Sequence, residues 1–141
     1  MKKVFYNSWI AKNLLFSNYT TITLLAWVFT KYSKDVVRQS LINHECTHAR
    51  QWVELTVISG LFLWIGLLLC DYSAWWLILS GFTFYILYII ESFIRWVYSW
   101  FMSKEYSAYR NTSFEKEARL AENDPNYLEN SHYFAWLKLM F

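Results

Sequence analysis

Two histidines and a glutamate lie close together in the sequence, as His44, Glu45 and His48 in the order His-Glu-x-x-His. Residues four positions apart lie on the same face of a helix, so the two imidazoles can bind one zinc ion. Glu45 is rotated to the side of that face, where its carboxylate can take a proton from a water in an open coordination position. The spacing therefore predicts a zinc site with His44 and His48 as ligands and Glu45 as the general base.

A catalytic zinc site needs a third protein ligand, because three side chains and one open position are its usual coordination. A second helix is predicted over residues 112–123, starting at a cap-like Thr-Ser pair and ending before Asn-Asp-Pro. Of its carboxylates, Glu117 lies on the apolar stripe, whereas Glu115 stands to one side. Periodicity alone favours Glu117, and His132 is the only other histidine in the chain.

The helix that carries the histidines is predicted to continue without a breaker into an apolar stretch, so that it covers residues 35–70. No charged side chain occurs in residues 55–70, and none occurs in residues 72–90. Of the 141 residues, 56% are hydrophobic and only 17% are charged, against about a quarter charged in an ordinary soluble domain. We therefore expect a helical hairpin with residues 73–101 as its second limb.

A membrane is the environment that this hairpin predicts. The first apolar stretch is roughly 24 Å long as a helix, and the second comes closer to the full thickness of a bilayer's hydrocarbon core. Tryptophans cluster toward the ends of the limbs, where amphipathic rings prefer the headgroup level. Basic residues flank the hairpin and are absent from its turn, which predicts an inner cell membrane with the site facing the cytoplasm. The alternative is a hydrophobic hairpin buried in a soluble oligomer.

The two ends of the chain are expected to complete a single, mainly α domain of residues 1–141. Residues 18–32 are rich in β-branched and aromatic side chains and do not fit one helical stripe, so a short β-hairpin is expected there. A third membrane helix over residues 13–30 is the alternative. The N-terminus lacks the apolar core and cleavage site of a signal peptide. Residues 130–141 are predicted as an apolar helix that lies on the membrane or covers the site.

The His-Glu-x-x-His motif, followed by Glu-Lys-Glu-Ala on a second helix, resembles the gluzincin metallopeptidases. More closely, residues 41–45 and 114–118 resemble a group of small bacterial membrane-associated proteins of minimal gluzincin type. The resemblance implies a helical zincin-like core, zinc as the cofactor and hydrolysis of peptide bonds. In that clan a small residue follows the ligand glutamate by three positions, as Ala118 follows Glu115. The resemblance therefore implies Glu115 as the third metal ligand, against the periodicity.

One position departs from the family pattern. Arg119 occupies the place where the pattern often has an Asp, whose role is to hold the tautomer of a ligand histidine. Gln51, one turn beyond His48, is a candidate for supplying that support. Two functions follow: a zinc metallopeptidase acting at the cytoplasmic membrane face, and a catalytically silent zinc-binding membrane protein with a structural, sensing or docking role.

The expected partners are a peptide or protein substrate and a lipid bilayer. The sequence does not decide whether two copies of the chain form a homodimer through the hairpin. The net charge is only +2 and no basic cluster is present, which argues against nucleic acid as a partner. Hydrolysis would also need a donor to the developing oxyanion, for which Tyr109, Arg110 and His132 are the candidates.

Overall fold

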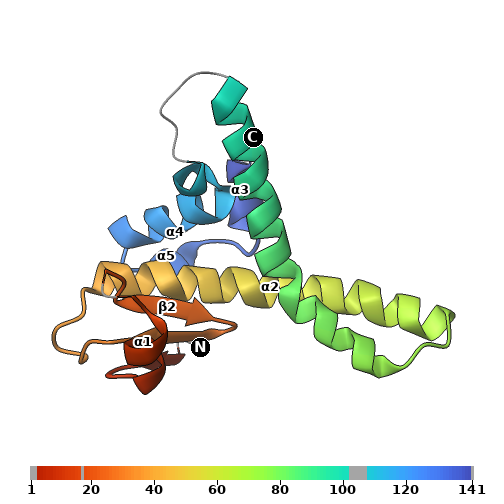
Figure 1. Cartoon of the computed structure of the whole chain (residues 1–141), viewed down its shortest axis with the longest axis horizontal. Coiled ribbons are helices and arrows are strands. Elements are labelled where there is room, and N and C mark those ends of the chain that lie inside the picture. Colours follow the sequence, from red (N-terminus) through yellow and green to blue (C-terminus); the bar gives the residue numbers. More distant parts are fainter. Residues whose placement is uncertain (1–2, 17, 102–107, 141) are drawn as a thin grey trace.

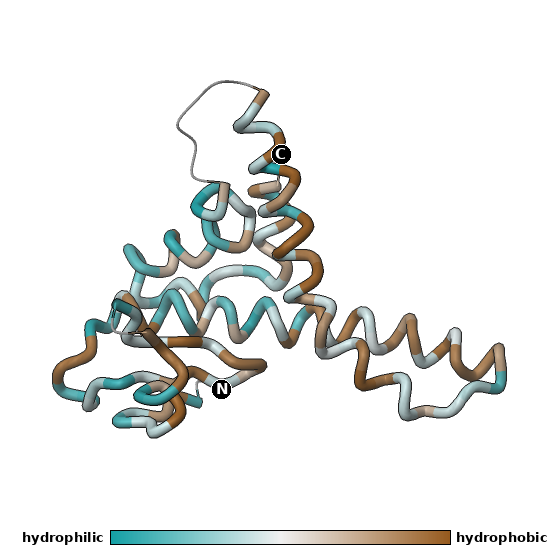
Figure 2. The backbone as a smooth tube through the Cα atoms, in the orientation of Figure 1, coloured by the Kyte–Doolittle hydropathy of each residue, from teal (hydrophilic) through white to brown (hydrophobic). Residues whose placement is uncertain are grey.

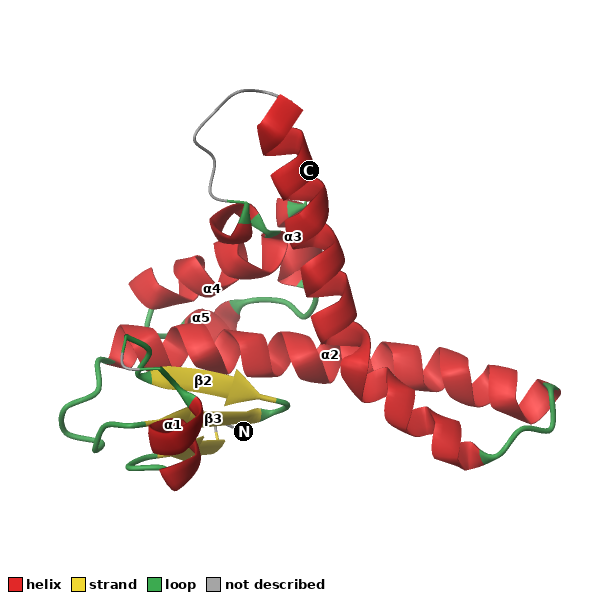
Figure 3. Cartoon of the chain, viewed as in Figure 1, coloured by secondary structure: helices red, strands yellow, loops and turns green. Residues whose placement is uncertain are grey.

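The computed structural model describes residues 3–16, 18–101 and 108–140, and this part of the chain is mainly helical, as predicted. Five α-helices and a small three-stranded sheet make up most of it (Figures 1 and 3). The α-helices are α1 (Trp9–Leu14), α2 (Gln39–Leu69), α3 (Thr83–Phe101), α4 (Ser113–Asn123) and α5 (Tyr127–Asn130). The 3-10 helices are η1 (Ala74–Phe82), η2 (Tyr109–Asn111) and η3 (Ala135–Leu139), and the strands are β1 (Lys3–Phe5), β2 (Thr21–Leu24) and β3 (Trp27–Thr30).

Helix α2 organises the molecule, because the sheet lies on one side of it and α4 on the other (Figure 1). It runs without a break from the His-Glu-x-x-His motif into the apolar stretch, as the sequence predicts. It begins at Gln39, four residues later than expected, because the amides of Val36 and Val37 both bond the carbonyl of Ser33 in a turn. The metal motif and the apolar limb therefore belong to one rigid element.

The predicted β-hairpin is present as β2 and β3, which pair antiparallel through a turn at Leu25. The alternative of a third membrane helix in this region is therefore wrong. Strand β1 pairs with β3 in parallel, so the sheet order is β1-β3-β2 and β2 lies at an edge. The sheet packs on α2 through a small core of Val28, Ile42 and Cys46. Strand β1 and helix α1 were not predicted, since both are too short to show a periodic pattern.

The apolar half of α2 is followed by η1, which returns along it as a hairpin. The turn is a Schellman motif, in which the amide of Tyr72 bonds the carbonyl of Leu67 at 3.0 Å and Asp71 adopts a left-handed conformation with φ 54°. At the other end of η1, the indole of Trp52 donates to the carbonyl of Gly81 at 2.8 Å. The two limbs are thus fixed at both ends.

The limb predicted over residues 73–101 is present as one helical segment, Ala74–Phe101, but only its first part lies along α2. The chain changes from a 3-10 helix to an α-helix at Thr83 and then turns away from α2 (Figure 1). Both α2 and the segment Ala74–Phe101 are long and apolar enough to cross a membrane, by length and composition. Figure 2 shows that the apolar residues concentrate in the hairpin and α3, away from the polar body.

The C-terminal segment is not the single helix predicted over residues 130–141, of which residue 141 lies outside the described part. Helix α5 ends at Asn130, and Phe134 has a φ of 58°, which separates it from η3. Trp136 is buried against Leu55, Phe84 and Phe114. The segment therefore supplies part of the core that joins α2, α3 and α4.

Candidate metal centre

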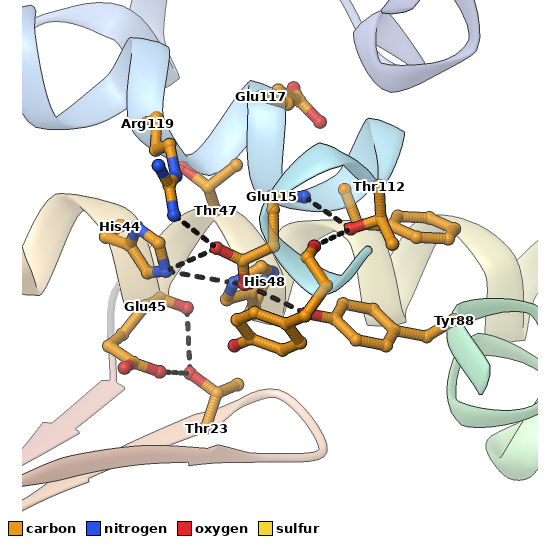
Figure 4. Close-up of polar contacts among 12 residues, drawn as sticks. Thr23, His44, Glu45, Thr47, His48, Tyr88, Thr112, Glu115, Glu117 and Arg119 are labelled. Atoms are coloured by element: carbon orange, nitrogen blue, oxygen red, sulfur yellow. Dashed lines mark hydrogen bonds and ion pairs between the residues drawn. The ribbon is translucent and has the colours of Figure 1, made fainter. Parts of the chain in front are cut away.

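Three side chains from α2 and α4 converge on one point (Figure 4). The Nε2 atoms of His44 and His48 are 3.1 Å apart. Glu115 Oε1 is 3.2 Å from His48 Nε2, and Glu115 Oε2 is 3.8 Å from His44 Nε2. One ligand atom from each residue lies within 4.8 Å of the others, so the group could hold a metal ion. Glu115, rather than Glu117, is the carboxylate that the fold brings to the two histidines.

The start of α4 is held in two ways, and this fixes Glu115 in its first turn. The hydroxyl of Thr112 accepts a hydrogen bond from the Glu115 amide at 3.3 Å, which is an N-cap interaction. From α3, Glu91 accepts hydrogen bonds from the amide and the hydroxyl of Ser113, at 2.8 and 2.7 Å. Ala118 is fully buried at the α2–α4 contact, where a small side chain lets the two helices approach.

Both histidines are oriented through their Nδ1 atoms. His44 Nδ1 lies 2.7 Å from the carboxylate of Glu122, and His48 Nδ1 lies 2.8 Å from Gln51 Oε1. Both partners are acceptors, so each Nδ1 carries a proton, and in the neutral form of each ring Nε2 is the nitrogen that could bind a metal ion. The support expected from an Asp at position 119 therefore comes from Glu122, two turns beyond Glu115 on α4, and from Gln51.

The orientation of Gln51 is itself determined by its neighbours. Its Nε2 donates to Glu117 Oε2 at 2.7 Å and to the Phe114 carbonyl at 3.1 Å, so its oxygen must face His48. Glu117 also forms an ion pair with Arg50 at 2.5 Å and is fully buried. Periodicity was therefore right that Glu117 points inward, but its partners are Arg50 and Gln51 and not the metal ligands.

Glu115 is a carboxylate held in its ionised form. Burial alone would raise the pKa of its carboxyl, but hydrogen bonding from His48 and the charge that His48 and His44 carry when protonated outweigh this and lower the pKa to about 2. The hydroxyl of Tyr88 donates to Glu115 Oε1 at 2.9 Å. Arg119, which is partly exposed, places Nη2 3.9 Å from Glu115 Oε2 and adds a positive charge beside it.

Glu45 faces the sheet. Its Oε2 accepts a hydrogen bond of 2.6 Å from the hydroxyl of Thr23 on β2 (Figure 4). Glu45, His44 and His48 line a groove of about 460 Å³ that β2 and α3 also line. The other lining residues are mostly apolar or aromatic: Leu15, Tyr19, Thr21, Ile22, Thr23, Phe84, Tyr85, Tyr88, Ile89 and Tyr109. The general-base candidate and the two ligand histidines thus share one accessible cavity.

Of the three candidate oxyanion donors, Tyr109 lines this groove, and Arg110 and His132 do not. Burial, above all, raises the pKa of Tyr109 to about 12, so its hydroxyl stays protonated at neutral pH. The sequence reasoning missed Thr23, Tyr88 and Glu122. Only Glu122 left a signal, since seven positions is two helical turns and brings it to the same face of α4 as Glu115.

The chain was compared with known proteins. No family model matches it, and no curated protein or solved structure matches it either.

Proposed function

We propose that this protein is a zinc-dependent metallopeptidase that hydrolyses peptide bonds at the cytoplasmic face of a membrane. The observation that carries the proposal is the pair of Nε2 atoms of His44 and His48. These nitrogens are 3.1 Å apart and Glu115 Oε1 lies 3.2 Å from His48 Nε2, so three atoms of the kinds that bind zinc face one point.

Zinc is the cation that this donor set fits best. Two neutral imidazoles and one carboxylate are ligands that zinc accepts in catalytic sites, with a fourth position left open. When bound there, zinc would polarise a peptide carbonyl and lower the pKa of a water molecule to about 7. The hydrogen bonds from His44 to Glu122 and from His48 to Gln51 support such a site, because they fix both rings.

Glu45 is the residue that would move protons. Its carboxylate lines the groove beside His44 and His48, where it would take a proton from the attacking water and return it to the leaving amine. The bond from Thr23 keeps this carboxylate beside β2. Tyr109, protonated and on the same groove, would donate to the oxyanion that develops on the substrate carbonyl.

Strand β2 supports a peptide as the substrate. The Lys31 amide bonds the Thr20 carbonyl, and this pair continues the register of β2 and β3. Hydrogen-bonded pairs alternate along an antiparallel ladder, so the backbone groups of Thr21 and Thr23 face away from β3. Both residues line the groove, where an extended peptide could add to β2 as a further strand.

The test compares zinc content and peptide cleavage in purified variants. Glu45→Gln should keep its zinc and lose cleavage by about 10²- to 10⁴-fold, since only the proton transfer is removed. His44→Ala should lose both, and His132→Ala, which alters an exposed histidine outside the groove, should change neither. Unchanged zinc content in His44→Ala would contradict the site, and equal cleavage by Glu45→Gln would contradict the mechanism.

One observation favours a catalytically silent zinc-binding role as the second candidate. Arg119 lies beside Glu115, where its charge competes with a metal ion for the carboxylate. Bound zinc in the native protein, with no cleavage of apolar or polar peptides by it or by Arg119→Ala, would support this second function.

A further inference from the structure

The outer face of α3 is apolar along its whole length. Its exposed side chains recur at helical spacing, with exposed fractions of 53% for Ile86, 66% for Ile89, 60% for Phe93, 58% for Trp96 and 77% for Trp100. The face toward the protein is instead the one with the polar groups: Tyr88, Glu91 and Arg95. A helix on the surface of a soluble protein has the opposite arrangement.

The inner face of α3 is fixed to the body. Glu91 binds the start of α4 through Ser113 and forms an ion pair of 2.7 Å with Arg95. Arg95 also donates to the Met140 carbonyl at 3.2 Å. These contacts hold α3 against α4 and the C-terminal segment, so the apolar face is presented outward and cannot rotate inward.

The apolar face continues onto a second element that points in another direction. The hairpin formed by residues 56–82 extends away from the rest of the molecule, and its exposed side chains are apolar too, among them Phe62, Leu68 and Trp75. Helix α3 turns away from the axis of this hairpin at Thr83 (Figures 1 and 2). Two helical elements that diverge in this way cannot both lie along the normal of one bilayer.

We propose that the hairpin of residues 56–82 inserts into the bilayer and that α3 lies in the plane of the membrane surface, with its outer face at the boundary of headgroups and acyl chains. In this arrangement a single bilayer surrounds the hairpin and also contacts the outer face of α3, and the two apolar surfaces are continuous. The aromatic side chains of Trp96, Tyr98 and Trp100 suit the headgroup level. From Thr56 to Cys70 the inserted limb is roughly 22 Å long, so it crosses most of a hydrocarbon core of roughly 30 Å.

A bilayer is the occupant that these observations favour over a second copy of the chain. A second copy would need a surface complementary in shape to both diverging elements at once, whereas the fluid interior of a bilayer adapts to any shape. The proposal does not depend on the metal site or on peptidase activity. It adds that the groove, whose wall includes Ile89 on α3, opens at the lipid–water boundary.

The test measures the depth of single nitroxide labels by power-saturation electron paramagnetic resonance. The full chain, with Cys70→Ser as background, is placed in vesicles of phosphatidylethanolamine and phosphatidylglycerol. Labels replace Ile86, Phe93 and Trp100 on α3, and Ile58 and Phe62 on the hairpin, all exposed apolar residues whose replacement leaves the core intact. The background variant alone should take up no label, because Cys46 is buried.

The expected result is one shallow depth for all three α3 labels and greater depth at the hairpin labels. A membrane-crossing α3 would instead give depths that differ by roughly 21 Å between positions 86 and 100, and this would overturn the proposal. Dipolar broadening at the α3 labels that disappears on mixing with unlabelled protein would identify a second copy as the occupant and would also overturn it. Retained far-ultraviolet circular dichroism confirms that each labelled variant is folded.

Discussion

The two halves of α2 follow opposite patterns within one continuous helix. Residues 39–55 bury polar side chains, namely Asn43, Thr47, His48, Gln51 and Glu54. Residues 56–69 expose apolar ones, namely Val57, Leu61, Phe62, Ile65, Leu68 and Leu69. In the first half, Gln51 donates to Glu117 and to the Phe114 carbonyl on α4, and Glu54 accepts from Trp136 in the C-terminal segment. The difference teaches that one helix can serve two surroundings, provided that its polar half is enclosed by protein and its apolar half by something equally apolar.

The largest effect is expected from Glu117→Ala, which removes the partner of the enclosed Arg50 and Gln51. Removing one partner of a buried ion pair destabilises a protein by about 3–5 kcal/mol, and the lower end is expected here because Arg50 keeps Glu54 at 3.5 Å. Equilibrium unfolding in detergent, followed by near-ultraviolet circular dichroism, measures this change. Glu129→Ala, on the exposed part of α5, is the matched control and should stay near the native value. Equal stabilities of the two variants would show that the polar half needs no enclosure.

The next largest effect concerns the apolar half. Phe62→Asp places a charge on a side chain that is 71% exposed, and Val36→Asp does the same at 66% exposure on the loop before α2. If lipid surrounds the apolar half, the first change costs about 2.5–3.5 kcal/mol of insertion free energy and the second costs almost nothing. Resistance of the protein to alkaline extraction from membranes measures the difference. Identical extraction of both variants would mean that water surrounds both sites.

A smaller effect, on zinc affinity, is expected when the hydrogen bond between His44 on α2 and Glu122 on α4 is removed. Glu122→Ala leaves His44 without its Nδ1 acceptor, and the loss of such a partner lowers metal affinity by about 10- to 100-fold. Competition with a chromogenic chelator measures the zinc affinity, and Glu129→Ala again serves as the control. The same affinity in both variants would show that Glu122 does not orient the ligand.

The smallest effect is expected at the N-cap of α4. Thr112→Ala removes the hydroxyl that accepts from the Glu115 amide, at a cost of about 1 kcal/mol in unfolding free energy. Thr112→Ser keeps that hydroxyl and should recover most of the loss in the same denaturation experiment. A Ser variant as unstable as the Ala variant would assign the effect to packing of the methyl group.

The local pattern of residues was sufficient to predict much of the secondary structure. The unbroken α2, the β2–β3 hairpin and the helix that carries Glu115 were all predicted, because each depends on propensity and periodicity within its own segment. The choice between Glu115 and Glu117 was harder, since both side chains are buried. What separates them is Arg50, which lies on another helix, and spacing along α4 carries no information about it.

The turn at Thr83 left no comparable signal. Residues 72–90 carry no charge, which fits a helix that crosses a bilayer as well as one that lies along its surface. No proline marks the bend either. What fixes the direction of α3 is the contact of Glu91 with Ser113 and of Arg95 with Met140, between segments distant in the sequence. The spacing of four between Glu91 and Arg95 suits an ion pair along one helix, but spacing carries no information about the contact of Glu91 with Ser113.

The continuity of α2 has a mechanical consequence. No hinge, proline or 3-10 turn separates Gln51 from the apolar half, so the helix transmits tilt as a stiff lever. A bilayer of different thickness changes the tilt of an inserted helix. The same rotation then reaches His44 and His48, and Glu115 moves with them because Glu117 holds α4 to Arg50 and Gln51 on α2. A change of membrane thickness would thereby tilt the three ligands as one unit relative to the bilayer.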